Sequence, residues 1–239
     1  MENKIIIGNM KMYMNIQDID KYLKEMESKI TNNVILCPTN IYIPYFLNKG
    51  YNIGIQNVHY QESGSYTGEV SPKQAYDIGI RYSIVGHSER RLHFNETDID
   101  INKKVKSCLS NNLSVILCIG ETEEEKNMLK TDIVLKHQLK IALNDIEKKY
   151  QDKIIIAYEP RWAIGTNKIP SNKEIKDTIN YIKLILRQCK LDLKVVYGGS
   201  INDKNIEVLK NIDNIDGFMV GGSCINPQKF GKIIQIINS

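Results

Sequence analysis

Residues 153–170 read KIIIAYEPRWAIGTNKIP, and this stretch indicates the kind of fold that the whole chain adopts. It begins with a short, almost wholly apolar run, Ile154–Tyr158, which is typical of a β-strand buried on both faces. The run ends at a carboxylate, Glu159, and eleven residues without a clear period follow it, from Pro160 to Pro170. A charged side chain in this place needs either a partner or a function.

Seven further apolar runs of this kind occur along the chain, which makes eight in all. They are Ile5–Gly8, Val34–Pro38, Ile53–Gln56, Ser83–Val85, Val115–Ile119, Val195–Tyr197 and Gly217–Val220. Amphipathic stretches of helical period separate most of them, and this alternation predicts an α/β protein with a parallel sheet. Eight units in 239 residues favour a single (β/α)8 barrel domain over residues 1–239. The alternative is a doubly wound open sheet, although no GxGxxG follows the first strand.

Several helix boundaries can also be predicted. Ser71–Pro72 and Asn226–Pro227 each combine a capping residue with proline at the first helical position. Ser171 and Glu174 have the spacing of a capping box. The first helical stretch is predicted to bury Ile16, Ile19, Leu23, Met26 and Ile30 on one face. The helices after the second and seventh strands are expected to be short.

Composition excludes several classes of protein. The net charge of +4 is too small for a nucleic-acid-binding protein, and no apolar run approaches the roughly 20 residues of a membrane helix. Five scattered cysteines without a CxxC pair argue against disulfides or a metal site, so no metal is expected. Reduced thiols and the lack of a signal-peptide pattern predict a cytoplasmic protein.

Seven segments resemble the triosephosphate isomerase family, in the family's order and over almost the entire chain. They are GNMKMY (8–13), QNVHYQESGSYTGEVSP (56–72), IVGHSERR (84–91), CIGET (118–122), AYEPRWAIGTNK (157–168), YGGSI (197–201) and VGGSC (220–224). The resemblance implies a TIM barrel that interconverts dihydroxyacetone phosphate and D-glyceraldehyde 3-phosphate through an enediol or enediolate. It implies no cofactor.

The resemblance also assigns catalytic roles. Glu159 is the expected base, in a water-poor site that raises its basicity. His87, at a predicted helix N-terminus that disfavours imidazolium, is the expected neutral electrophile. Lys11 and Asn9 would stabilise the enediolate oxygen, and Glu89 would orient Lys11 or the His87 turn, or take part in proton transfer. Structural readings of the same residues are an ion-paired glutamate, a core histidine and a surface lysine.

Two glycine-rich turns are expected to bind the substrate phosphate through backbone N–H groups. By resemblance the donors come from Ser200, Gly222 and Gly165, with Gly221 close by. Two ordinary tight turns are the alternative interpretation.

Residues 160–170 resemble the family's lid, which excludes water from the enediolate, and Tyr197 and Ser200 resemble its latch. The chain departs from the family's pattern at the lid hinges, with Arg161, Asn167 and Ile169–Pro170, and at Ser223. Pro170 restricts the backbone, so altered lid motion with retained chemistry is expected. Ser223 is expected to be tolerated.

The segment 62–71 resembles the loop that enters a pocket of a second subunit in this family. Tyr66 and Thr67 form its tip, and Glu69 and Arg90 are candidates for a pair at the interface. A homodimer is therefore expected, with a tetramer still open.

Two other functions stay open. Another phosphate-binding barrel would act on a different sugar phosphate, which the phosphate turns alone do not distinguish. A non-catalytic barrel would have lost a catalytic residue, whereas Lys11, His87 and Glu159 are all present.

Overall fold

Eight parallel strands form a closed barrel in the computed structural model, which describes residues 3–164 and 168–239. The strands are β1 (Ile5–Asn9), β2 (Val34–Cys37), β3 (Asn52–Ile55), β4 (Tyr82–Val85), β5 (Ser114–Ile119), β6 (Ile154–Tyr158), β7 (Lys194–Tyr197) and β8 (Gly217–Val220). The predicted (β/α)8 barrel is confirmed, and each predicted strand end is correct to within one residue.

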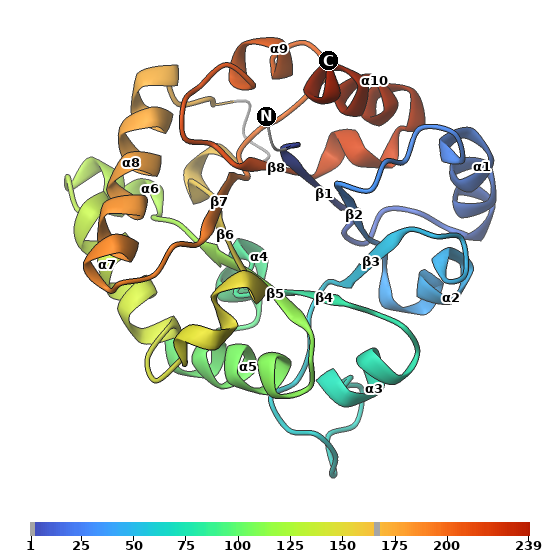
Figure 1. The fold of residues 1–239 in the computed structure, drawn as a ribbon, viewed down its shortest axis with the longest axis horizontal. Helices are drawn as coiled ribbons and strands as arrows, with labels where there is room; N and C mark the ends of the chain where they lie inside the picture. Colours follow the sequence, from blue (N-terminus) through green and yellow to red (C-terminus); the bar gives the residue numbers. More distant parts are fainter. Residues whose placement is uncertain (1–2, 165–167) are drawn as a thin grey trace.

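The first and last strands pair with each other and close the barrel. Strand β1 pairs with β2 on one side and with β8 on the other, so that Ile6 lies opposite both Val34 and Phe218. In Figure 1 the strands form the central ring and the helices surround it. A doubly wound open sheet is thereby ruled out.

The outer layer consists of helices and short 3₁₀ segments. The helices are α1 (Ile16–Met26), α2 (Ile43–Phe46), α3 (Pro72–Asp77), α4 (Ser88–His93), α5 (Asp98–Ser110), α6 (Glu123–Asn127), α7 (Thr131–Ala142), α8 (Asn172–Gln188), α9 (Ile206–Leu209) and α10 (Pro227–Asn238). The 3₁₀ segments are η1 (Asn40–Tyr42), η2 (Lys148–Lys153), η3 (Arg161–Ala163) and η4 (Gly222–Ile225). Among these helices, none combines the length and apolarity that crossing a membrane requires.

The local helix signals are confirmed. Ser71, Ser171 and Asn226 are N-caps, and the side chain of each accepts a hydrogen bond from a backbone N–H inside its helix. The helices after β2 and β7 are short, as expected.

The predicted buried face of α1 is partly wrong. Ile19 and Met26 are buried, but Ile16 is exposed and Tyr22 is buried in addition. Ile30 lies beyond the end of the helix. The helix covers too few turns to keep all five predicted residues on one stripe.

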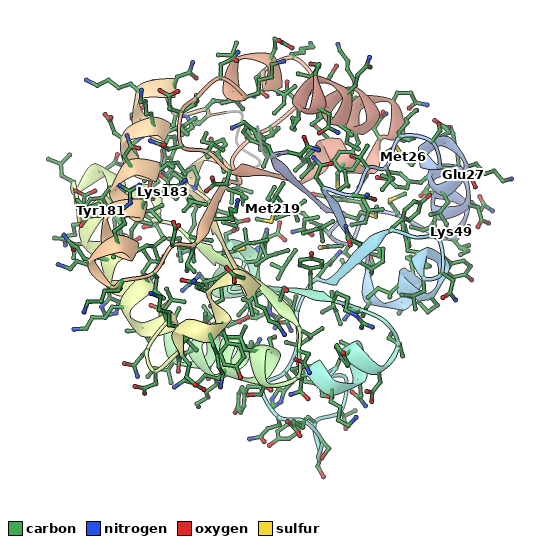
Figure 2. All side chains as sticks on the ribbon, in the orientation of Figure 1. Met26, Glu27, Lys49, Tyr181, Lys183 and Met219 are labelled. Carbon is green, nitrogen blue, oxygen red and sulfur yellow. The ribbon has the colours of Figure 1, made fainter. Side chains whose placement is uncertain are left out.

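The core has two layers. The larger layer lies between the strands and the helices, and alternate strand residues fill the barrel itself. The barrel interior contains Ile7, Ile35, Cys37, Ile84, Ile116, Cys118, Ile155, Ala157, Val196 and Met219. Figure 2 shows Met219 near the centre of the ring, whereas Tyr181 and Lys183 lie outside on α8. Because side chains fill the barrel, a ligand has room at the rim and not along the axis.

Candidate active site

The carboxyl ends of the strands border a cavity of about 510 Å³. Asn9 from the end of β1, His87 after β4 and Glu159 after β6 all line it. Lys11 lines it too, as do the turns at 198–200 and 221–223. Residues that are more than 200 positions apart in the sequence are thus brought together at one site, as a parallel barrel requires.

Glu159 is held at the rim by its neighbours on β5. Its N–H donates to the carbonyl of Ile119 at 2.8 Å, which extends the pairing of β5 and β6 by one residue. A Cβ atom on Gly120 would lie 1.8 Å from the Glu159 carbonyl oxygen, so glycine is needed for this approach. The buried Gln138 amide bonds both the N–H and the carbonyl of Gly120. No sequence motif pointed to Gln138.

The Glu159 carboxylate contacts His87. Its Oε1 lies 3.2 Å from His87 Nε2, and its Oε2 accepts a hydrogen bond from the Ser88 N–H at 3.2 Å. Burial acts to raise the pKa of Glu159, but His87 and the Ser88 amide outweigh it, and the pKa lies below its ordinary value. The expected rise in basicity is therefore wrong for this arrangement, because the carboxylate is stabilised by its partners.

His87 caps the short helix α4. Its Nδ1 accepts the N–H of Glu89 at 3.3 Å, and this pattern assigns the proton of a neutral ring to Nε2. Burial acts to lower the pKa of His87, but the Glu159 carboxylate more than offsets it, and the pKa is raised. The expectation that the helix N-terminus lowers it is wrong while Glu159 lies against the ring. Movement of Glu159 away from the ring removes that contribution.

Lys11 has a strained backbone that three contacts maintain. Its φ angle is 51°, in the left-handed region that residues with a Cβ rarely adopt. The Lys11 N–H donates to Asn9 Oδ1 at 3.1 Å. Its carbonyl accepts from Thr39 Oγ1 at 2.7 Å and from Gln56 Nε2 at 2.9 Å. Thr39 and Gln56 were not predicted to have roles, although Gln56 begins one of the recognised segments.

The Lys11 side chain forms a close ion pair within the site. Its Nζ lies 2.6 Å from Glu89 Oε1, and the Lys11 side chain is 15% exposed. A Cβ atom on Gly221 would lie 3.8 Å from the same Nζ, so the ammonium group is next to the turn after β8. Of the roles considered for Glu89, this contact favours orientation of Lys11.

The turn after β7 depends on a close approach. A Cβ atom on Gly199 would lie 2.0 Å from the Tyr197 hydroxyl oxygen. Ser200 Oγ donates to the Ala163 carbonyl at 2.6 Å, which links this turn to the start of the predicted lid. The buried Tyr197 hydroxyl has no hydrogen-bond partner among residues 3–164 and 168–239.

The turn after β8 is linked to the one after β7. Ser223 Oγ donates to the Ile201 carbonyl at 2.9 Å. Gly221 and Gly222 line the cavity, and a Cβ atom on Gly222 would meet no atom within 4 Å. The two turns therefore form one continuous wall of backbone.

The start of the predicted lid packs on the loop after β5. Trp162 Nε1 donates to Glu121 Oε1 at 2.7 Å, and the Lys126 ammonium lies 3.4 Å from the centroid of the Trp162 ring. Burial raises the pKa of Glu121 above its ordinary value. Arg161 is half-buried, and its N–H donates to the Glu121 carbonyl at 3.0 Å. Neither Glu121 nor Lys126 was predicted to have a role. Gly165 and Asn167, which were predicted to belong to the lid, lie outside the described residues.

The predicted interface loop protrudes from the barrel. In Figure 1 the segment between β3 and α3 extends beyond the ring of helices. Tyr66 stacks near His59, with ring centroids 4.2 Å apart, and Thr67 and Glu69 are exposed. Arg90 pairs with Glu96 of its own chain at 2.6 Å.

Comparison with known proteins places the chain in one family. The family model described as triosephosphate isomerase matches residues 4–237. A triosephosphate isomerase of Clostridium botulinum (strain Langeland) is 39% identical over 247 aligned positions, which cover 98% of this chain and 100% of the relative. That of Malacoplasma penetrans is 39% identical and covers 98% of both chains. That of Dictyoglomus thermophilum is 36% identical, over 98% of this chain and 100% of its own.

Proposed function

The chain belongs to the triosephosphate isomerase family, and we propose that the residues around its cavity of about 510 Å³ perform the reaction of that family. The protein interconverts dihydroxyacetone phosphate and D-glyceraldehyde 3-phosphate, an aldose–ketose isomerisation of glycolysis and gluconeogenesis. One observation carries the assignment of roles. Glu159, His87 and Lys11 line a single cavity together with the two glycine turns.

Glu159 is the base of this mechanism. Its carboxylate leaves His87 and takes a proton from the carbon beside the substrate carbonyl, and the electrons of that C–H bond form the double bond of the enediolate. The same carboxylate then returns the proton to the neighbouring carbon. Its buried position at the rim, 2% exposed, limits competition from water.

His87, Lys11 and Asn9 act on the oxygens. The neutral His87 ring donates from Nε2 to the carbonyl oxygen and moves a proton between the two enediol oxygens. The Lys11 ammonium and the Asn9 amide stabilise negative charge as it develops. Glu89 positions Lys11 through their 2.6 Å ion pair.

The substrate phosphate binds at the wall that the turns after β7 and β8 form. Backbone N–H groups of Ser200, Gly222 and Gly165 are the donors, and Gly221 lies close by. Residues 160–170 form a cover that keeps water from the enediolate, with Tyr197 and Ser200 as its latch. The bond from Ser200 to the Ala163 carbonyl supports that role for Ser200.

The test is conversion of D-glyceraldehyde 3-phosphate to dihydroxyacetone phosphate by the purified protein and by Glu159→Gln. We expect fast turnover that falls about 10²- to 10⁴-fold in the variant, because a general base is lost. Glu27 is an exposed residue at the C-terminal end of α1. Glu27→Gln is the control for removal of a carboxylate, and its turnover should match that of the unaltered protein. A folded protein without turnover would contradict the assignment and favour the non-catalytic alternative.

A homodimer completes the proposal. A second cavity of about 550 Å³ lies beside the first and is lined by Lys11, His87 and Glu89 as well as exposed Met12 and Ile41. We assign it to the 62–71 loop of a second copy, with Tyr66 and Thr67 at the tip and a contact between Glu69 and Arg90 across the interface. Thr67→Arg should give monomers in analytical ultracentrifugation and lower the turnover. An unchanged dimer would contradict this assignment.

The remaining assignments concern the whole chain. We place the protein in the cytoplasm as one folding domain, which the match of the family model over residues 4–237 supports. Cys37, Cys108, Cys118 and Cys224 are buried free thiols, as a reducing compartment allows. Cell fractionation tests the location, and a single cooperative unfolding transition tests the domain organisation.

A further inference from the structure

Lys229 lines the same cavity as the catalytic residues, at its phosphate end. It lies on α10, one turn after the N-cap Asn226, and α10 follows directly after the second glycine turn. The residue is exposed. No ion pair and no side-chain hydrogen bond engages its ammonium group within residues 3–164 and 168–239.

The other cation of the cavity is already neutralised. Lys11 lies 2.6 Å from the Glu89 carboxylate. Glu159 adds a further negative charge beside them, so without Lys229 these three groups leave the site with one net negative charge. A phosphate ester that carries two negative charges would be repelled from such a site. Lys229 restores the balance without itself being paired.

Lys229 is the third residue of α10 and lies in its first turn. A cation in the first turn opposes the helix dipole and costs stability.

We propose that Lys229 is a substrate-positioning residue that attracts and holds the phosphate dianion at the mouth of the site. This inference rests on the proposed function, because the phosphate belongs to the substrate of that reaction. The positive end of α10 and the Lys229 ammonium act on the same end of the cavity, and both favour an anion there. Glu159, His87 and Lys11 carry out the chemistry without it.

The experiment compares Lys229→Gln with Lys136→Gln. Lys136 is an exposed lysine on the outer helix α7, and its ammonium group has no ion pair within residues 3–164 and 168–239. Lys229→Gln should raise KM for D-glyceraldehyde 3-phosphate about three- to tenfold and leave kcat nearly unchanged. Turnover of D-glyceraldehyde, which lacks the phosphate, should be the same in all three proteins. The dissociation constant of inorganic phosphate, measured by calorimetry, should rise with KM.

A charge reversal separates a functional role from a structural one. Lys229→Glu places an acid in the first turn of α10, so Tm should rise while KM for the phosphorylated substrate rises further than in Lys229→Gln. Loss of both stability and affinity would indicate a structural role and overturn the proposal. Equal KM values and equal phosphate affinities in Lys229→Gln and Lys136→Gln would overturn it too. If the unaltered protein shows no isomerase activity, the proposed function fails, and the calorimetric comparison still decides the role of Lys229.

Discussion

The two walls of the active-site cavity are built in different ways. The wall formed by the ends of β1, β4 and β6 consists of side chains that contact one another: the buried pair His87 and Glu159, and the partly exposed pair Lys11 and Glu89. The wall formed by the turns after β7 and β8 consists of backbone, with Gly199, Gly221 and Gly222. The function proposed for the first wall depends on charge and proton position, whereas that proposed for the second depends on the shape of the backbone, with the Lys229 ammonium at its edge.

This difference determines what a substitution should do. Removal of a charged group from the side-chain wall takes away stabilisation that exists in the transition state, and kcat falls. A change to the backbone wall should alter contacts with the phosphate that we propose binds there and does not react, and KM should rise. Four experiments test this difference between the two walls.

The largest effect should come from Lys11→Met, which keeps the length of the side chain and removes its charge. We expect kcat/KM to fall about 10²- to 10³-fold, mostly through kcat, because the developing enediolate loses its cation. Lys11→Met combined with Glu89→Gln is the control, since it removes the carboxylate that the single variant leaves unpaired. Recovery in the double variant to within tenfold of the unaltered protein would show that Lys11 serves mainly to neutralise Glu89.

Gly199→Ala tests the shape of the backbone wall. The new methyl group would lie 2.0 Å from the Tyr197 hydroxyl, so the turn must move. We expect a loss of about 1–3 kcal/mol in the free energy of unfolding and a rise in KM that exceeds the fall in kcat. Gly222→Ala is the matched control for stability, because a Cβ atom there meets nothing within 4 Å. Equal stability of the two variants would contradict the steric argument.

Ser223→Ala should have a smaller effect. It removes the hydrogen bond that joins the two glycine turns, which reaches the Ile201 carbonyl at 2.9 Å. The expected cost is about 1 kcal/mol in the free energy of unfolding, with at most a few-fold rise in KM. Ser223→Thr keeps the hydroxyl group and should retain the bond. A larger loss in the threonine variant than in the alanine variant would argue against the hydrogen bond as the cause.

The fourth test concerns protonation and needs no turnover. The Glu159 carboxylate raises the pKa of His87, against the lowering effect of burial. Glu159→Gln should therefore lower the pKa of His87, as measured from its imidazole resonances by NMR. Below its raised pKa, His87 as a cation stabilises the folded state, and this contribution is lost as pH rises through that pKa. An unchanged titration in the variant would show that the two groups are not coupled.

Local patterns in the sequence were sufficient for the framework. The eight strands, the caps at Ser71, Ser171 and Asn226, and the two shortest helices follow from residues close together in the chain. The face of α1 was predicted less well, since packing against the barrel selected Tyr22 in place of Ile16. Strands and helix caps depend on residues that are neighbours in the chain. Their prediction therefore holds whenever the tertiary structure buries the same apolar face.

The amino-acid sequence was sufficient to predict the fold class, the family and the candidate catalytic residues at the carboxyl ends of the strands. Only the tertiary structure showed the contacts that hold these residues in place. Thr39 and Gln56 donate hydrogen bonds to the carbonyl of the strained Lys11, and Gln138 accepts one from the N–H of Gly120. The tertiary structure also reversed the expected pKa shifts of Glu159 and His87 and brought Lys229 to the cavity. These properties depend on the distance between groups that barrel closure brings together from remote parts of the chain, and no local pattern encodes that distance.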